Sequence, residues 1–255
     1  MKGVRNLNGM FLGCANWLLG GAALPINLSA WDVSYVYEFQ NMFFGCTKGD
    51  FKLWDTLGGN YTGNIDCKGM FKNCANFVNG NTGTIELWGS SFSQVNNCQQ
   101  MFYGARLFNR DISGWDTSGV TNMYQMFSTN SASTVMAFNQ PIGSWDVSNV
   151  NDMRGMFTGC DNFDQNLSSW NVNAWSNNSL STTPLTNSIG NFTLSTSNYD
   201  ALLVAWDSYA FPSMPSGTVN FGNSTYSLIS PGNSVANART SLISKWGAIS
   251  DGGGV

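Results

Sequence analysis

Apolar residues recur along the chain in a unit of roughly 30 residues that two landmarks define. The first landmark is the dipeptide Met-Phe, whose methionines are 32, 28, 31, 25 and 30 residues apart. The second is a tryptophan three residues after an apolar residue, as in the pair Ile142 and Trp145, and it alternates strictly with the first. This alternation indicates a repeat protein. The methionines are Met10, Met42, Met70, Met101, Met126 and Met156, and the tryptophans are Trp31, Trp54, Trp88, Trp115, Trp145 and Trp170.

Each unit contains two local patterns, which predict one short helix and one short strand. After Val150, apolar residues follow at distances of 3, 6 and 7 residues, a spacing typical of one helical face. Ser148 stands two residues before this stripe, where an N-cap hydroxyl belongs, and Ser34 and Ser118 hold the same place in other units. The preceding segment, 142–147, is short and apolar and is flanked by Gly or Asn, which favours an extended conformation.

A unit of this size cannot bury its apolar side alone, but a stack of such units can. We therefore predict an α/β repeat fold, a leucine-rich-repeat-like right-handed solenoid of about seven to eight coils with short parallel strands and short helices. Six units fill residues 1–175, and the first begins in the predicted helical half. An N-terminal cap is accordingly expected to be missing or minimal.

The pattern pauses after the sixth tryptophan and then returns in altered form. Residues 176–188 are expected to form a loop, and residues 189–255 are expected to form modified coils that act as a C-terminal cap. Within the cap, Ser197 and Asp200 are placed for a capping box at the start of a helix, and Gly247 is placed to end another helix. The apolar spacing predicts helices over 199–209 and 235–245 and strands over 219–221 and 248–251.

The composition narrows the classes of function. Charged residues are only 10% of the chain, far below the usual quarter, and Asn, Ser, Thr and Gly supply the remaining polarity. The net charge is −4 and the basic residues are scattered, so no surface for nucleic acid is expected. No apolar run is long enough for insertion into a membrane, and residues 1–25 are too interrupted by Asn and Gly to form a signal peptide.

Catalytic signatures are missing from the sequence. The chain has no histidine, which removes Ser-His-Asp triads, Cys-His pairs and HExxH zinc sites. It has no phosphate-binding glycine loop, and its two glutamates, Glu38 and Glu86, do not form a group. We therefore expect no enzymatic activity, no cofactor and no metal.

The six cysteines occupy positions where other units carry small or apolar residues. Four of them follow the methionine of Met-Phe by four residues, where Ala105 stands in another unit, and Cys67 and Cys98 take a place that methionine holds elsewhere. We interpret all six as reduced thiols packed inside the coils. A disulfide stays open for one pair of neighbouring units, Cys46 with Cys74, because stacked coils approach the required distance.

Stacking the units aligns the tryptophans and the aspartates that follow them. Their fixed distance from apolar positions favours tryptophans that face inward, whereas tryptophans that face outward would offer an aromatic stripe to sugar rings or peptide. The aspartates are expected to fix turns or to cap the following helices, and a column that binds a cation or a basic partner stays open. The predicted core ladder contains Trp31, Trp115, Trp145, Met126, Met156, Cys14, Cys46, Cys74 and Cys160.

Two units carry a resemblance to a known family. FNRDISGWDTSGVTNMYQMF and FNQPIGSWDVSNVNDMRGMF, at 108–127 and 138–157, resemble the repeats of BspA-like leucine-rich-repeat surface proteins, known from mycoplasmas and other bacteria and also met in protists and phage genomes. The C-terminal segments NYDALLVAWDS, FGNSTYS and ARTSLISKWGAISDGG resemble the usual end of such proteins. The resemblance implies surface display and binding, adhesion in some members, and no catalytic residue. This chain differs from secreted members because it lacks a signal peptide and a lipoprotein cysteine.

We therefore expect a non-enzymatic, surface-exposed binding or assembly module. The favoured interpretation is a structural, decoration or fibre protein of a phage virion, located on the virion surface. The alternative is an extracellular cell-surface adhesin that binds a host protein or a glycan. Expected partners are proteins, including copies of the chain itself or other virion proteins. The positions that the repeat leaves variable are the candidate binding residues, namely Asn139, Gln140, Ser144, Asn149, Asn151, Arg154 and the insertion residues Ser128, Thr129, Asn130 and Ser131.

Overall fold

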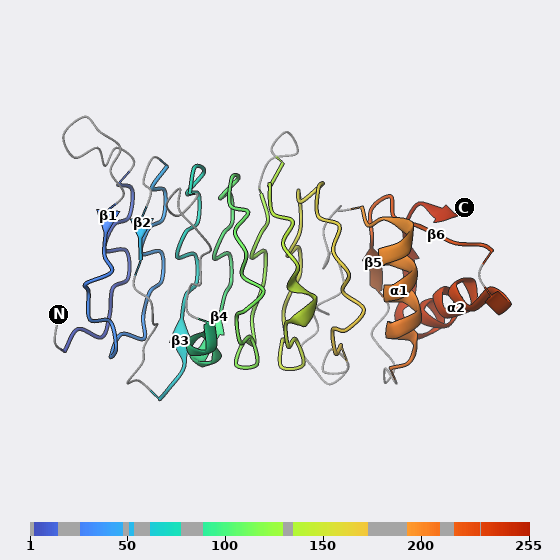
Figure 1. The fold of residues 1–255 in the computed structure, drawn as a ribbon, viewed down its shortest axis with the longest axis horizontal. Coiled ribbons are helices and arrows are strands. Elements are labelled where there is room, and N and C mark those ends of the chain that lie inside the picture. Colours follow the sequence, from blue (N-terminus) through green and yellow to red (C-terminus); the bar gives the residue numbers. More distant parts are fainter. Residues whose placement is uncertain are drawn as a thin grey trace.

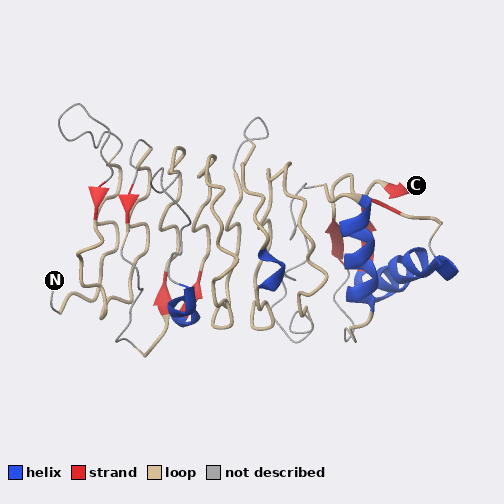
Figure 2. Ribbon diagram, viewed as in Figure 1, coloured by secondary structure: helices blue, strands red, loops and turns tan. Residues whose placement is uncertain are grey.

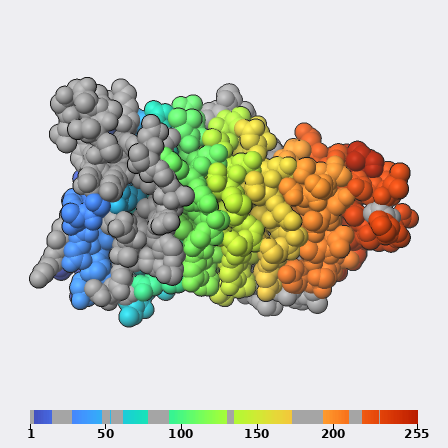
Figure 3. Space-filling model, viewed as in Figure 1, coloured from blue at the N-terminus to red at the C-terminus, as the bar shows by residue number. Residues whose placement is uncertain are grey.

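A stack of coils leads into a helical C-terminal unit (Figure 1). Each coil of the stack contains one Met-Phe dipeptide, and successive coils form adjacent bands along the molecule (Figure 3). The fold comes from a computed structural model, which describes residues 3–14, 26–47, 51–53, 62–77, 89–129, 135–172, 193–209, 217–229 and 231–255. The loop expected over 176–188 lies outside these residues.

Backbone hydrogen bonds join each coil to the next in a regular ladder. Counted from the methionine of Met-Phe, the N–H groups at positions −3, −1, +1 and +3 donate to the carbonyl oxygens at positions −4, −2, 0 and +2 of the following coil. The same four bonds occur between five successive pairs of coils, with N···O distances of 2.6–3.0 Å. Parallel bridges run through position −4 of all six coils, which is occupied by Asn6, Glu38, Asp66, Asn97, Asn122 and Asp152.

Regular secondary structure in the stack is short, and Figure 2 shows most of it as loops and turns. Strand β1 pairs in parallel with β2, and β3 pairs in parallel with β4. Two 3₁₀ helices complete the described elements of the stack. The bounds are β1 Ile26–Asn27, β2 Phe51–Lys52, β3 Ile65–Asp66, η1 Gly89–Gln94, β4 Val95–Asn97 and η2 Ile142–Ser144.

The short helix expected in each unit is replaced by consecutive turns in the described coils. Position −1 has a left-handed backbone in every coil, and Gly155 there has a φ of 62°. Position +3 repeats this conformation in five of the six coils, as at Gly159 with a φ of 81°, the exception being Thr129. A right-handed helix cannot continue through such residues. The inward side chains lie at positions −3, 0, +1 and +4. Their spacing is also that of one helical face, and for this reason the sequence pattern wrongly predicted a helix.

Two related expectations are also corrected. The segment around Ile142, which the pattern predicts to be extended, forms the 3₁₀ helix η2, and the parallel bridge of that unit lies at Asp152. In the first coils the corresponding segments are extended as expected, because β1 and β2 pair there in parallel. Ser148 caps no helix: its backbone N–H donates to Asp146 Oδ1 at 2.9 Å. The same Asp-to-Ser turn occurs at Ser34 and Ser118.

Aromatic rings stack from coil to coil through the centre of the molecule. The phenylalanines of Met-Phe form one column, with neighbouring ring centroids 5.3–6.1 Å apart. A second column of phenylalanines packs against the first at 3.8–4.5 Å. Stacked aromatic pairs contribute about 0.5–1.5 kcal/mol each beyond their burial. The columns are Phe11, Phe43, Phe71, Phe102, Phe127 and Phe157, and Phe77, Phe108, Phe138 and Phe163.

In its described residues, the C-terminal unit contains two α-helices, four short strands and one 3₁₀ helix. Tyr199, Leu202, Leu203 and Trp206 form the buried face of α1, and the rings of Trp206 and Trp246 meet edge to face at 6.1 Å between α1 and α2. Strand β5 pairs in parallel with β7, and β6 pairs in parallel with β8. The bounds are α1 Thr196–Asp207, β5 Gly217–Asn220, β6 Thr225–Tyr226, η4 Pro231–Asn233, α2 Ser234–Trp246, β7 Gly247–Ser250 and β8 Gly253–Gly254.

The start of α1 differs from the expected capping box. The N-cap residue is Ser195, and no side-chain cap bond forms there. Asp200 instead accepts from the backbone N–H and the hydroxyl of Ser227, so it joins α1 to the segment after β6. Gly247, with a φ of 96°, ends α2 at the residue where the sequence placed the stop.

Candidate binding face

One face of the stack carries the side chains at positions −4, −2 and +2 of each coil, and we call it the ladder face. These positions lie beside the inward positions −3, 0 and +1, and their side chains keep contact with solvent in every coil except at the buried Ser128. Most of them are half-buried, because neighbours in adjacent coils pack against each other along each column. The ladder face therefore presents a set of side chains at fixed coil spacing.

The centre of the ladder face holds five residues that we call the aromatic–cation patch: Phe44, Lys72, Tyr103, Tyr124 and Arg154. The Nζ atom of Lys72 lies 5.0 Å from the ring centroid of Tyr103 and 5.7 Å from that of Phe44. The guanidinium carbon of Arg154 lies 5.2 Å from the ring centroid of Tyr124. Each such contact contributes about 0.5–1 kcal/mol at an exposed site. The patch thus holds two cations against three rings.

Hydrogen bonds hold the cations of the patch in place. The Nζ of Lys72 donates to Gln100 Oε1 at 2.8 Å, and Gln100 Nε2 donates to Gln125 Oε1 at 2.8 Å. Arg154 makes a two-point contact with Asp152, with distances of 2.9 and 2.7 Å. Side chains fixed in this way lose little further conformational freedom when a ligand binds.

The electrostatics of the patch follow from its partial burial. Burial lowers the pKa of Lys72, and the neighbouring charge of Lys68 lowers it further. Burial likewise raises the pKa of Tyr103, with a second contribution from Tyr124. Within the described residues neither Lys68 nor Lys72 takes part in an ion pair. An anionic group placed between these two lysines would relieve their repulsion.

Beside the patch, carboxylates and amides form a column at position −4. Gln40 Nε2 donates to Glu38 Oε2 at 3.3 Å and to Asp66 Oδ2 at 2.9 Å, so one amide joins two acids from successive coils. Asn97 adds a bond to Asp66 Oδ2 at 3.1 Å. The described residues contain no group of three or more His, Cys, Asp or Glu side chains that could hold a metal ion. The column thus places linked amide and carboxylate groups beside the patch.

Four of the candidate binding residues form bonds between coils instead of a free surface. Asn139 Oδ1 accepts from the backbone N–H of Asp164 at 3.0 Å, and the N–H of Asn139 donates to Asn109 Oδ1 at 2.8 Å. The other three donate to backbone oxygens of the preceding coil. These are Gln140 to Asn109 at 3.0 Å, Ser144 to Ser113 at 3.1 Å and Asn149 to Ser118 at 2.8 Å.

The remaining candidates lie in different environments. Arg154 belongs to the patch, and Asn151 is exposed, with a backbone N–H that donates to Thr121 O at 2.8 Å. Ser128 and Thr129 are buried, at 0% and 8% exposure, so they are not part of an exposed insertion loop. The last two, Asn130 and Ser131, lie outside the described residues.

The residues assigned to the core ladder are buried, apart from two at the first coils. Trp115 and Trp145 stack with centroids 6.1 Å apart, and the indole nitrogen of Trp145 donates to Ile112 O at 3.1 Å. Trp31 and Cys14 are partly buried and pack against the core. The side chains that are at most 2% exposed are Met126, Met156, Trp145, Cys46, Cys74 and Cys160, and Trp115 is 4% exposed.

All six cysteines are free thiols. The thiol of Cys46 donates to Phe11 O at 3.0 Å, that of Cys74 to Phe43 O at 2.9 Å and that of Cys160 to Phe127 O at 3.2 Å. Each thiol therefore satisfies a carbonyl of the preceding coil. Burial, followed by the charge of Cys14, raises the pKa of Cys46 to about 12, so this thiol is protonated at neutral pH.

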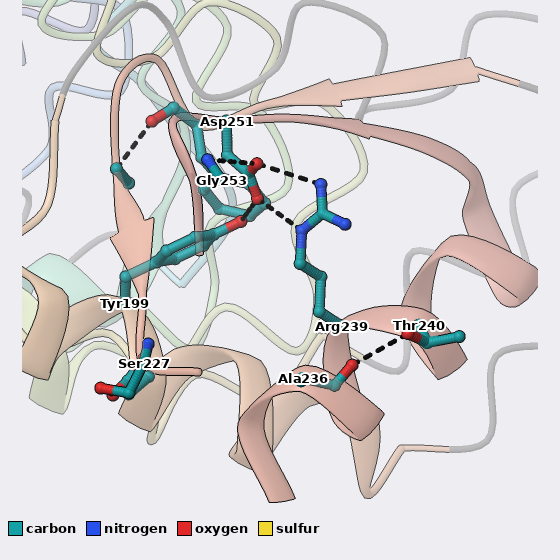
Figure 4. Close-up of polar contacts among 10 residues, drawn as sticks. Tyr199, Ser227, Ala236, Arg239, Thr240, Asp251 and Gly253 are labelled. Carbon is teal, nitrogen blue, oxygen red and sulfur yellow. Dashed lines mark hydrogen bonds and ion pairs between the residues drawn. The ribbon is translucent and has the colours of Figure 1, made fainter. Parts of the chain in front are cut away.

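A second polar cluster lies inside the C-terminal unit (Figure 4). Asp251 accepts from Tyr199 Oη at 2.7 Å, from Arg239 Nε and Nη2 at 2.7 and 3.0 Å, and from the backbone N–H of Gly253 at 3.1 Å. Its carboxylate is 2% exposed, and Arg239 also covers the ring of Tyr226. The cluster joins α1, α2 and the segment before β8, and it leaves no carboxylate oxygen open to a ligand.

Sequence reasoning missed four of the five patch residues: Phe44, Lys72, Tyr103 and Tyr124. A signal existed for the first three, because position +2 directly follows Met-Phe and holds a different residue in each of the six coils, whereas Tyr124 stands at position −2. The predicted helix placed this position just beyond the helix end, where a variable residue does not indicate a binding site.

The described residues contain no helix that is long and apolar enough to span a membrane.

Comparison with known proteins gives one match. A family model described as "Mycoplasma protein of unknown function, DUF285" matches residues 1–87 and 65–192. These two overlapping segments cover the coil stack. No curated protein and no solved structure matches the chain.

Proposed function

Because the chain belongs to the DUF285 family, whose model matches most of its length, we propose that it is a non-enzymatic binding module displayed at a surface. We also propose that the protein is of the BspA-like class and that its coils form a right-handed, leucine-rich-repeat-like stack. The aromatic–cation patch is its contact region, and the ligand is a glycan or a protein on another surface.

The observation that carries this proposal is the placement of Lys72 between the rings of Phe44 and Tyr103. An amino group held against two rings and bonded to Gln100 is preorganised, and the face around it supplies amides and carboxylates. The patch also contains tyrosine and arginine, which are enriched among the anchor residues of binding interfaces. The scarcity of charge elsewhere on the chain makes this patch stand out.

The test uses substitutions that the repeat itself already accepts. Position +2 is Thr158 in the sixth coil, so Lys72→Thr places a residue that this position tolerates, and Tyr103→Ser copies Ser128. We expect the double variant to lose about tenfold or more in binding to a glycan array or to intact cells. Leu107→Ser is the control, because Leu107 is 52% exposed and lies outside the ladder face.

Each outcome separates the alternatives. Loss of binding by the double variant but not by Leu107→Ser, with equal melting temperatures, supports the patch. Retention of full binding by the double variant excludes the patch as the contact region. Binding to purified proteins without binding to any glycan assigns the ligand to the protein class.

A second candidate function is a structural component of a phage virion. It is favoured by the first coil, where Met10 and Leu12 are 47% and 57% exposed, since an apolar end suits assembly with another polypeptide. Light scattering distinguishes the two functions. A stable oligomer that does not bind glycans or cells supports assembly, and a monomer that binds a glycan supports the adhesive module.

A further inference from the structure

We propose that the outer edge of the first coil binds one extended polypeptide segment as an additional coil, by pairing with its backbone. The occupant is a partner segment that donates alternate N–H groups and carries an apolar Met-Phe-like pair. This edge is the side of the first coil that faces away from the second coil, at the N-terminal end of the stack (Figure 1). The inference goes beyond the ligand proposed for the patch and does not depend on it.

The hydrogen-bond ladder defines what the edge lacks. Between five successive pairs of coils, four carbonyl oxygens of the later coil accept from four N–H groups of the earlier coil. The corresponding oxygens of the first coil belong to Asn6, Asn8, Met10 and Leu12. Within the described residues, no N–H group donates to any of these four oxygens. The edge thus presents the same acceptors as the five interfaces between coils, but no segment among the described residues supplies the donors.

The apolar side chains at this edge are also left uncovered. Met10 is 47% exposed, whereas Met42 and the other methionines of its column are fully buried by the coil before them. Leu12 is 57% exposed and lies two residues further along the same edge. Covering them would remove apolar surface from water at about 25 cal/mol per Å².

The cysteine column gives an independent observation. The thiols of Cys46 and Cys74 each donate to the phenylalanine carbonyl of the coil before them, at 3.0 and 2.9 Å. Cys14 holds the same position in the first coil and is only partly buried. A segment bound at the edge would bring a carbonyl to Cys14, as Phe11 does to Cys46.

The chemistry of the edge also selects its occupant. The four backbone groups at the edge are acceptors, so two copies of the chain that met edge to edge would oppose carbonyl oxygens without any donor between them. A symmetric pair of first coils is therefore unfavourable. A segment with N–H groups at alternate positions completes the ladder, as in other cases where an extended peptide adds to a sheet edge.

The fifth coil supplies a probe with the required donors. Residues 121–129, TNMYQMFST, donate through the N–H groups of Met123, Gln125, Phe127 and Thr129 in the structure. A fluorescent synthetic peptide of this sequence should bind the chain saturably, as measured by fluorescence anisotropy. A peptide with those four nitrogens methylated keeps every side chain but loses the donors, and we expect its affinity to be about tenfold lower or weaker.

Variants of the chain locate the bound peptide. Leu12→Asp should weaken binding of the unmodified peptide about tenfold, because a carboxylate would replace the apolar side chain at position +2, on which the peptide would stack. Leu107→Asp is the matched control, since Leu107 is similarly exposed at 52% and lies away from the edge. Circular dichroism melting curves confirm that both variants are folded, and the methylated peptide tests the proposal without altering the chain.

Three results overturn the proposal. One is no binding of the unmodified peptide up to its solubility limit. Another is equal binding of the methylated and unmodified peptides. The third is a dimer in sedimentation equilibrium that Leu12→Asp dissociates, which would assign the edge to a second copy of the chain. Failure of these tests leaves the patch proposal unaffected, because the glycan and cell-binding assays probe the patch, whose residues lie in the second to sixth coils and not at this edge.

Discussion

The coil stack and the C-terminal unit reach stability by different means. In the stack, each residue type packs on its counterpart in the next coil, so rings lie on rings and thiols meet carbonyls of the preceding coil. In the C-terminal unit, two α-helices pack together around a buried carboxylate, Asp251, which bonds to Tyr199 from 52 residues away. The stack relies on repeated short-range contacts, and the C-terminal unit relies on a few long-range ones.

The two kinds of contact predict how far the effect of a substitution should extend. In a stack, stability is close to a sum of coil and neighbour terms, so a local defect affects the adjacent coils most. In the C-terminal unit one polar cluster ties several elements together, so its loss should loosen all of them. Asp164 links the two regions, because it accepts from the backbone N–H of Ser195 at 2.8 Å and from Asn198 Nδ2 at 2.8 Å.

The largest effect is expected from the tryptophan column of the stack. Trp145→Ala removes a ring that is 2% exposed, that stacks on Trp115, and whose nitrogen bonds to Ile112 O. The variant should lose about 3–5 kcal/mol of unfolding free energy, as measured by urea denaturation. A loss below 1 kcal/mol, on the order of a surface substitution, would contradict an inward-facing column.

A smaller loss is expected from the polar cluster of the C-terminal unit. Asp251→Ala leaves Arg239 and the hydroxyl of Tyr199 without their carboxylate and should cost about 2–3 kcal/mol, since Arg239 keeps partial contact with water. Asp152→Ala is the matched variant in the stack. Its ion pair with Arg154 is 24–32% exposed, so its loss should cost less than about 1 kcal/mol. Equal losses of unfolding free energy for the two variants would show that the C-terminal unit depends on its polar cluster no more than the stack depends on its ion pair.

The left-handed positions of the stack provide a graded test. A Cβ atom on Gly69 would overlap Asn41 Oδ1 of the preceding coil, whereas a Cβ on Gly9 meets only Leu12 at ordinary contact distances. Both Gly→Ala substitutions pay about 1–2 kcal/mol for the left-handed backbone. Gly69→Ala should lose about 1–3 kcal/mol more from crowding.

A second substitution identifies the cause of that extra loss. Adding Asn41→Gly to Gly69→Ala removes the atom that the new methyl group would strike. Thermal melting should show partial recovery of stability in the double variant. If the double variant is as unstable as the sum of its single substitutions, crowding against Asn41 is not the cause.

Acid should loosen the C-terminal unit and its junction with the stack. Burial alone would raise the pKa of Asp251, but hydrogen bonds from Arg239 and Tyr199 outweigh it and lower the pKa below 3.8. The pKa of Asp164 is lowered in the same way by Ser195 and Asn198. A lowered folded-state pKa means that the stabilisation is full above pH 3.8 and is lost as the pH falls through the folded-state value.

Hydrogen exchange followed by mass spectrometry checks this acid effect. On acidification below pH 3.8, amides of 217–255 should lose protection before those of 95–129, after correction for the intrinsic rate at each pH. Asp251→Asn should remove most of the pH dependence of this region. Simultaneous loss of protection in both regions would show that the stack carries the acid sensitivity.

The smallest effect concerns thiol reactivity in the stack. At pH 8 the thiolate fraction of Cys46 is about one part in ten thousand, because its pKa is about 12. Buried thiols of the folded chain should therefore react slowly with a thiol reagent, and Cys14, which is only partly buried, should react first. After denaturation without reductant, six thiols should titrate. Four would indicate a disulfide, such as one between Cys46 and Cys74.

Much of the stack could be foreseen from the spacing of its apolar residues. The period follows from Met-Phe alone, and the inward position of Met156 and Cys160 follows from their interchange with apolar residues in other units. The local conformation could not be foreseen in this way. A helix places the side chains at positions −3, 0, +1 and +4 on one face. The observed coil, which turns at left-handed residues, buries the same positions. The apolar pattern therefore does not distinguish the helix from the observed coil.

The candidate site was harder to foresee, because polarity alone does not reveal what a side chain bonds to. Asn139 and Ser144 look like free surface residues in the sequence, yet they bond to Asn109 and Ser113, about one repeat earlier. Lys72 looks like an ordinary solvated cation, yet rings from the coils on both sides hold it. These contacts depend on which residues the stacking register places side by side.

Residue types and their spacing are enough to predict the period, the alternation of its landmarks and the set of buried side chains, since burial of apolar surface depends mainly on residue type. Tertiary structure decided how the chain turns within each coil, which amides and hydroxyls are used between coils, and where two cations meet three rings. Those features require groups from about 30 residues apart to approach within hydrogen-bond distance. Only the stacked coils provide that proximity.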